Sequence, residues 1–163
     1  MTAPSVAGKV GIGKGIREML MEIKHEFTKV TAPETFAAVL GDVFAVQHEF
    51  DRAKEQLFVV GLNTKHAIRY LDLVSMGTID ASLVHPREVF RHAVNFGVAK
   101  IAVAHNHPSG DLQPSREDIA VTKQLIKAGS ILGIPLMDHL IVSMNAGDFL
   151  SLRSEHPELG WTA

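Results

Sequence analysis

Apolar residues recur at the spacing of a helix face in the first part of the chain. They predict a short amphipathic helix over 16–27 and a second helix over 33–48. Thr31 and Glu34, three residues apart, have the pattern of a capping box at the start of the second helix. Residues 1–15 are rich in Gly and Ala, which favours a loose arm ahead of the first helix.

Runs of apolar and β-branched residues follow. Residues 56–62 and 67–74 flank the turn formers at 63–65, and this arrangement predicts a hairpin. The nearly continuous apolar run 98–104 predicts a strand that is covered on both faces, and residues 134–143 predict a last core strand.

Two further helices separate these strands. One begins at Pro86 and is closed by Gly97, and the other begins at Ser115 and ends near Gly129. A chain of 163 residues has the length of one domain.

Composition narrows the chemistry. The 16 Lys and Arg residues are balanced by 18 Asp and Glu residues, so the charge indicates no surface for a nucleic-acid backbone or an anionic membrane. The chain has no cysteine, which excludes disulfides, thiolate nucleophiles and cysteine-based zinc sites, so a metal would have to bind His and carboxylate side chains. No stretch has the length and apolarity of a membrane span or a secretion signal, and we expect a cytoplasmic protein.

A polar cluster follows the apolar run that ends at residue 104. His105 and His107 are two residues apart, so in a strand both side chains point to the same face and can converge on one ion. Ser115 and Asp118 follow in a pattern that also caps helices. The cap and a ligand role are compatible, because a cap would hold Asp118 at a helix start that faces the histidines.

The residues His105-x-His107, Ser115 and Asp118 resemble the JAMM motif of the JAB/MPN metalloproteins. The fuller stretch from His105, His-Asn-His-Pro-Ser-Gly-Asp and then Pro-Ser-x-x-Asp, is similar to the RadC-like branch of that family. Further resemblance lies in 77–80, 86–89 and 136–142, within an overall match of residues 31–153.

The resemblance implies an α/β fold with a curved mixed sheet flanked by helices, of the cytidine-deaminase-like or MPN type. It divides the chain into residues 1–30, an arm with a short helix, and residues 31–163, a RadC-like MPN/JAB metallohydrolase domain.

The resemblance also implies one zinc ion per chain, held by His105, His107 and Asp118 with water as the fourth ligand. In the family a Glu just before the first core strand takes the proton of the water. Glu55 stands at the matching place, and Glu88 is the alternative. Ser115 matches a serine that hydrogen-bonds the site and can stabilise an oxyanion.

The function so implied is zinc-dependent hydrolysis of amide bonds by a metallopeptidase or isopeptidase, with a peptide or protein substrate. The alternative is a non-catalytic MPN-type binding module or a DNA-maintenance accessory protein. A nucleic-acid partner rests on the family name alone, no membrane partner is expected, and the sequence leaves homo-oligomer formation open. Asp138 and His139 fit either a role in supporting the metal-binding histidines or a structural pair near the last strand.

Overall fold

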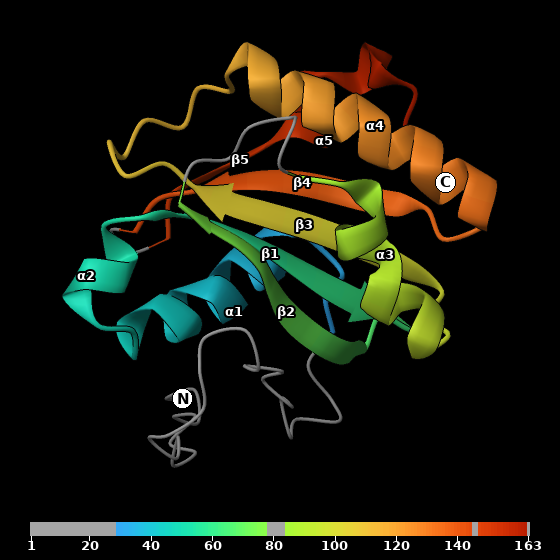
Figure 1. Ribbon diagram of the computed structural model, residues 1–163, viewed down its shortest axis with the longest axis horizontal. Coiled ribbons are helices and arrows are strands. Elements are labelled where there is room, and N and C mark those ends of the chain that lie inside the picture. The colour runs from blue at the N-terminus through green and yellow to red at the C-terminus, as the bar shows by residue number, and fades with distance from the viewer. Residues whose placement is uncertain (1–28, 78–83, 145–146, 163) are drawn as a thin grey trace.

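The sheet of this protein has five strands and is mixed, with helices on both faces (Figure 1). The structure is a computed structural model that describes residues 29–77, 84–144 and 147–162. The expected α/β fold with a mixed sheet is confirmed. The strands are β1 (Glu55–Leu62), β2 (Ile68–Gly77), β3 (Lys100–Asn106), β4 (Leu136–Val142) and β5 (Phe149–Ser151). The helices are α1 (Pro33–Ala45), α2 (Glu49–Arg52), α3 (Pro86–Asn95), α4 (Arg116–Leu132) and α5 (Leu152–Glu155), followed by a 3-10 turn, Pro157–Leu159.

The order of the strands across the sheet is β2-β1-β3-β4-β5. β1 pairs antiparallel with both β2 and β3, β3 pairs parallel with β4, and β4 pairs antiparallel with β5. The predicted hairpin is therefore confirmed as β1 and β2. At its turn the side chain of Asn63 accepts hydrogen bonds from the backbone N–H groups of Lys65 and Ala67, at 2.9 and 3.0 Å.

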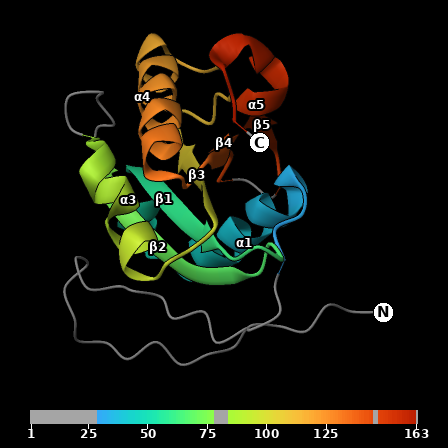
Figure 2. The same ribbon diagram turned by 90° about the vertical axis from the view of Figure 1, so that its right-hand side faces the viewer.

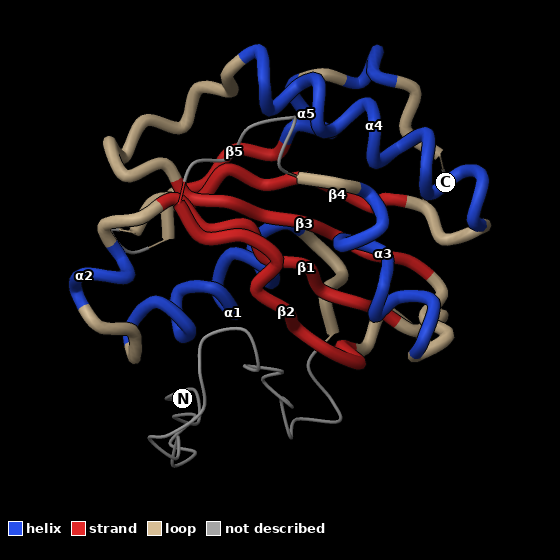
Figure 3. Tube along the Cα trace, viewed as in Figure 1, coloured by secondary structure: helices blue, strands red, loops and turns tan. Residues whose placement is uncertain are grey.

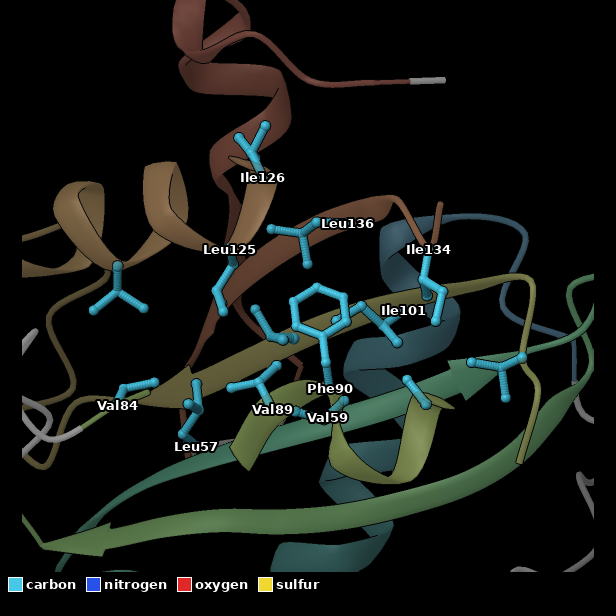
Figure 4. Close-up of a cluster of buried hydrophobic side chains, with 14 of the residues drawn as sticks. Leu57, Val59, Val84, Val89, Phe90, Ile101, Leu125, Ile126, Ile134 and Leu136 are labelled. Carbon is cyan, nitrogen blue, oxygen red and sulfur yellow. The ribbon is translucent and has the colours of Figure 1, made fainter. Parts of the chain in front are cut away.

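The sheet separates two apolar clusters, as expected for strands that are covered on both faces. α3 and α4 lie over one face and α1 lies over the other (Figures 1 and 2). Along β3, Ile101 and Val103 belong to the cluster between the sheet and helices α3 and α4. Ala102 and Ala104 belong to the cluster between the sheet and α1. Phe90 of α3 lies within the first cluster, near Ile101 (Figure 4). This alternation continues to the end of β3 and decides which way its polar residues point.

The first described helix, α1, begins at Pro33 as predicted, but its cap differs from the predicted one and it ends earlier. The residue before α1 is Ala32, and the hydroxyl of Thr35, not the pair Thr31 and Glu34, takes part in the cap: it donates to the Ala32 carbonyl at 2.8 Å. α1 ends at Ala45, and the separate short helix α2 follows. The side chain of His48 caps α2, which is why the helix pattern extended this far.

α4 begins as predicted, with Ser115 as its cap, but it continues past Gly129 to Leu132. The residue that closes it is Gly133, which adopts a φ of 68°. Gly129 serves a different purpose: a Cβ atom there would lie 2.6 Å from the carbonyl oxygen of Ile134, so glycine permits the close approach of the helix to the chain that enters β4. A long loop, residues 107–115, joins β3 to α4 and is drawn in tan in Figure 3.

The predicted N-terminal arm and helix, residues 1–28 of the segment 1–30, lie outside the described residues. Lys29 forms an isolated bridge with Ala67, and Val30 is buried, so the packed chain includes the last two residues of that segment. No described helix is long and apolar enough to cross a membrane.

Candidate metal centre

Four side chains converge at one end of the sheet. Glu55, His105, His107 and Asp118 each offer one ligand atom, and these atoms all lie within 4.8 Å of one another. Glu55 is the first residue of β1, His105 and His107 lie at the end of β3 and just after it, and Asp118 is in the first turn of α4. β1 and β3 run antiparallel with Gln56 opposite Asn106, so the start of one strand meets the end of the other.

The two histidines face each other. Nε2 of His105 lies 3.0 Å from Nε2 of His107 and 3.1 Å from Oδ1 of Asp118. Nδ1 of His107 lies 2.7 Å from the backbone carbonyl oxygen of Asp111. A carbonyl oxygen only accepts hydrogen bonds, so this Nδ1 carries the proton and Nε2 of His107 presents its lone pair to the cluster.

Ser115 and Asp118 form a reciprocal cap at the start of α4. The backbone N–H and the hydroxyl of Ser115 both donate to Oδ2 of Asp118, each at 2.7 Å, and the N–H of Asp118 donates to the Ser115 hydroxyl at 3.1 Å. Burial by itself raises the pKa of Asp118, but the hydrogen bond and charge of His105 and the hydrogen bonds of Ser115 outweigh it. The pKa of this carboxyl group lies well below its usual range. The cap thus holds a buried, ionised carboxylate beside the histidines.

The two candidate glutamates lie in different places. Oε1 of Glu55 is 3.9 Å from Nε2 of His107, so Glu55 lies within the cluster. Glu88 lies on α3 and forms ion pairs with Arg87 and Arg91, at 3.5 and 3.3 Å. The structure therefore brings Glu55 to the predicted ligands, and it does not bring Glu88 there.

The pair Asp138 and His139 divides between two roles, because successive residues of a strand point to opposite faces. Asp138 accepts hydrogen bonds from the Ser151 hydroxyl at 2.7 Å and from the backbone N–H of Arg153 at 3.2 Å, which is a structural arrangement. His139 lies on the face of the cluster, where its Nε2 is 2.8 Å from Nδ1 of His105.

The roles of two residues near the cluster, Asn106 and Thr122, were not predicted from the sequence. Asn106 lies between the two histidines but points to the other face. There its Oδ1 accepts from the N–H of Gln56 at 2.9 Å and its Nδ2 donates to the carbonyl of Lys54 at 3.0 Å, so one amide braces the backbone on both sides of Glu55. Thr122 lies one helix turn after Asp118, and its hydroxyl contacts His139. Both contacts join residues that only the fold brings together.

The chemistry of the donors fits a metal ion. Once their Nε2 atoms carry no proton, the two histidines present lone pairs, as the carboxylates of Asp118 and Glu55 do, and the four groups crowd into one small volume. Only a cation or shared protons can satisfy such a group. Imidazole nitrogen and carboxylate oxygen are ligands that transition metals accept. The cluster can therefore hold a metal ion.

The chain is similar to known proteins over most of its length. Residues 30–157 match the family described as "RadC-like JAB domain". A UPF0758 protein of Caldanaerobacter subterraneus is 41% identical over 147 residues, which are 89% of this chain and 60% of that protein. A UPF0758 protein of Methanosarcina mazei is 45% identical over 151 residues, 89% of this chain and 65% of that protein.

A third relative, a UPF0758 protein of Geobacillus kaustophilus, is 48% identical over 105 residues, 63% of this chain and 45% of that protein. The chain spans about half the length of the curated relatives that it matches. The family match covers the whole cluster, from Glu55 to Asp118, and most of the described fold. The chain belongs to the family of RadC-like JAB domain proteins.

Proposed function

We propose that this protein is a zinc-dependent hydrolase of amide bonds that acts on a peptide or protein substrate. The observation that carries the proposal is the convergence of two imidazole Nε2 atoms and two carboxylates within 4.8 Å of one another, at a point where β1, β3 and α4 meet. A metal-dependent hydrolase is also the function that the JAB domain family supports.

Three residues of the cluster would supply the ligands. His105, His107 and Asp118 would hold the zinc ion, and three protein ligands leave the open position that a catalytic zinc site requires. When bound, zinc supplies Lewis acidity, which makes water acidic enough to lose a proton near neutral pH and polarises a carbonyl group. His105 and Asp118 are almost wholly buried, which fixes their positions.

Glu55 is the residue that we assign to proton transfer. Its side chain is 18% exposed and that of His107 is 15% exposed, so the cluster opens towards solvent on this side. A substrate carbonyl would approach there. The Glu55 carboxylate would accept one proton from the attacking water and deliver it to the amine nitrogen as the carbon–nitrogen bond breaks. This second proton transfer returns Glu55 to its starting form.

Ser115 supports the ligands in this proposal. Its hydroxyl proton is directed at Oδ2 of Asp118, and its oxygen accepts the Asp118 N–H. The hydroxyl therefore positions Asp118 in the resting site. To stabilise an oxyanion, as the family resemblance implies, it would have to rotate away from Asp118.

The test combines metal analysis with hydrolysis. Metal content is measured by mass spectrometry after zinc loading and removal of free metal, in the wild type and in a His105→Ala, His107→Ala double variant. Hydrolysis is followed with a peptide library and with an isopeptide-linked substrate. Glu55→Gln removes the proton acceptor but keeps the shape of the side chain, and Glu88→Gln is the matched control on α3.

We expect about one zinc ion per chain in the wild type and in both glutamine variants, and none in the double variant. We expect Glu55→Gln to lower the rate of hydrolysis by about 100-fold or more, and Glu88→Gln to leave it unchanged. A wild type that takes up no zinc refutes the proposal and favours a binding module. Full hydrolysis by Glu55→Gln refutes the assigned role of Glu55.

A further inference from the structure

A chain of hydrogen bonds runs behind the metal-binding cluster, on the side away from solvent. The Thr122 hydroxyl donates to the backbone carbonyl of Asp118, with an O–O distance of 2.6 Å. The same hydroxyl oxygen lies 2.7 Å from Nδ1 of His139, and Nε2 of His139 lies 2.8 Å from Nδ1 of His105. The other ring nitrogen of His105, Nε2, lies 3.1 Å from Oδ1 of Asp118 and is the atom that would bind the metal.

The direction of each hydrogen bond follows from the first one. A backbone carbonyl only accepts, so the single proton of the Thr122 hydroxyl points at Asp118. The hydroxyl oxygen must then accept, which places a proton on Nδ1 of His139. The neutral His139 ring presents a lone pair at Nε2, and this lone pair accepts the proton on Nδ1 of His105.

We propose that Thr122 and His139 are positioning residues that fix the tautomer of His105, so that its Nε2 is kept as a metal ligand. The proposal rests on the metal site of the proposed function, but it does not depend on what that site hydrolyses. His107 reaches the same state by a simpler route, since its Nδ1 donates to the carbonyl of Asp111.

Because the side chains are buried, each hydrogen bond in this chain depends on the partner that the protein supplies. His105, Thr122 and His139 are each at most 1% exposed, so water cannot replace a missing partner. Without the Thr122 hydroxyl, Nδ1 of His139 loses its acceptor, and the ring can place its proton on Nε2. His105 would then have to accept at Nδ1 and carry its proton on Nε2, where it blocks the metal.

The tautomer of His139 is measured directly, on the metal-free wild type. Long-range ¹H–¹⁵N spectra at about pH 8, above the ordinary histidine pKa of about 6.5, distinguish a protonated from an unprotonated ring nitrogen. We expect Nδ1 of His139 to be protonated and Nε2 to be unprotonated. The reverse pattern overturns the proposal, whether or not the protein binds metal.

The metal affinity is measured by competition with a chromophoric zinc chelator. Thr122→Val keeps the shape of the side chain and removes the hydroxyl, whereas Thr122→Ser keeps the hydroxyl. Thr35→Val is the matched control, because Thr35 caps α1 on the other face of the sheet. We expect the Kd for zinc to rise by about 10–100-fold in Thr122→Val and to change little in the other two variants.

These readouts separate a positioning role from a structural one. A Thr122→Val variant that loses stability but keeps both the zinc Kd and the His139 tautomer of the wild type overturns the proposal. If Thr122→Val fails to fold, the test uses the two remaining measurements. These are the ¹H–¹⁵N spectrum of His139 in the wild type and the zinc Kd of Thr122→Ser. A wild type that binds no zinc defeats the proposed function, and the His139 spectrum still tests the hydrogen-bond chain separately.

Discussion

Replacing Asn106 with alanine tests how the end of β3 holds the start of β1. The Asn106 amide is fully buried, and it is hydrogen-bonded to the N–H of Gln56 and to the carbonyl of Lys54. In Asn106→Ala the N–H of Gln56, a residue that is also fully buried, loses its acceptor. The carbonyl of Lys54 belongs to an exposed residue, and water can replace the lost donor there.

The magnitude follows from these two environments. An unsatisfied buried N–H lowers the free energy of unfolding by about 1–3 kcal/mol, and the exchange of the Lys54 bond for one to water contributes about 1 kcal/mol or less. We therefore expect a total loss of about 1–4 kcal/mol in Asn106→Ala. The matched control is Asn95→Ala, at an exposed position at the end of α3, where a change within about 0.5 kcal/mol is expected.

The assay is urea denaturation followed by circular dichroism, with a chelator present so that bound metal does not add to the stability. Asn106→Ala that is as stable as Asn95→Ala would refute the view that this amide braces the backbone around Glu55. A second variant, Asn106→Asp, separates the two bonds. It keeps an acceptor for Gln56 but turns an oxygen towards the carbonyl of Lys54, so it too should be less stable than the wild type.

Three further substitutions test the packing and the buried polar groups. The buried Tyr70 hydroxyl has no hydrogen-bond partner among the described residues. Tyr70→Phe should therefore raise the free energy of unfolding by about 1–3 kcal/mol, and a loss in urea denaturation would contradict this. A Cβ atom at Gly61 would overlap the Tyr70 ring, so Gly61→Ala should cost about 1–3 kcal/mol, less in a Tyr70→Ala background, as a double-mutant cycle would show. Burial raises the pKa of Asp138, and its hydrogen bonds offset this only in part. The folded pKa thus lies above the unfolded value of about 3.9, and this group lowers stability as the pH rises from about 4 through the folded pKa. The stability of Asp138→Asn relative to the wild type should therefore increase over that range in denaturation at several pH values, and a decrease would exclude the assignment.

Local patterns were sufficient to predict most of the elements. The helix that starts at Pro86 and the hairpin around Asn63 agree with the structure, because their signals lie within a few residues of the feature that they predict. The ends of helices were less certain. His48 caps a new helix, and Gly129 lies within α4, where it makes room for a neighbouring chain. The role of each residue depends on contacts that the local sequence does not contain.

The same limit applies to the candidate site. His105, His107 and Asp118 could be proposed together because they lie close in sequence, and the structure brings them within reach of one another. Asn106 and Thr122 could not be assigned. The partners of Asn106 lie on β1 and just before it, and Thr122 meets His139 only because α4 packs beside β4. Pairing between distant segments determines their roles.

The origin of the ligands has a consequence for the order of events as the chain folds. His105, His107 and Asp118 come from one short stretch of sequence, whereas Glu55 joins them only when β1 pairs with β3. Closing a short loop takes little conformational entropy, so the stretch that carries these three residues can capture a metal ion before the sheet is complete. A metal ion that binds this stretch in the unfolded chain would stabilise the fold by less than its affinity for the folded protein alone would give. Because Glu55 joins the cluster through the pairing of β1 with β3, a chain in which these strands have not yet paired would lack the residue that we assign to proton transfer.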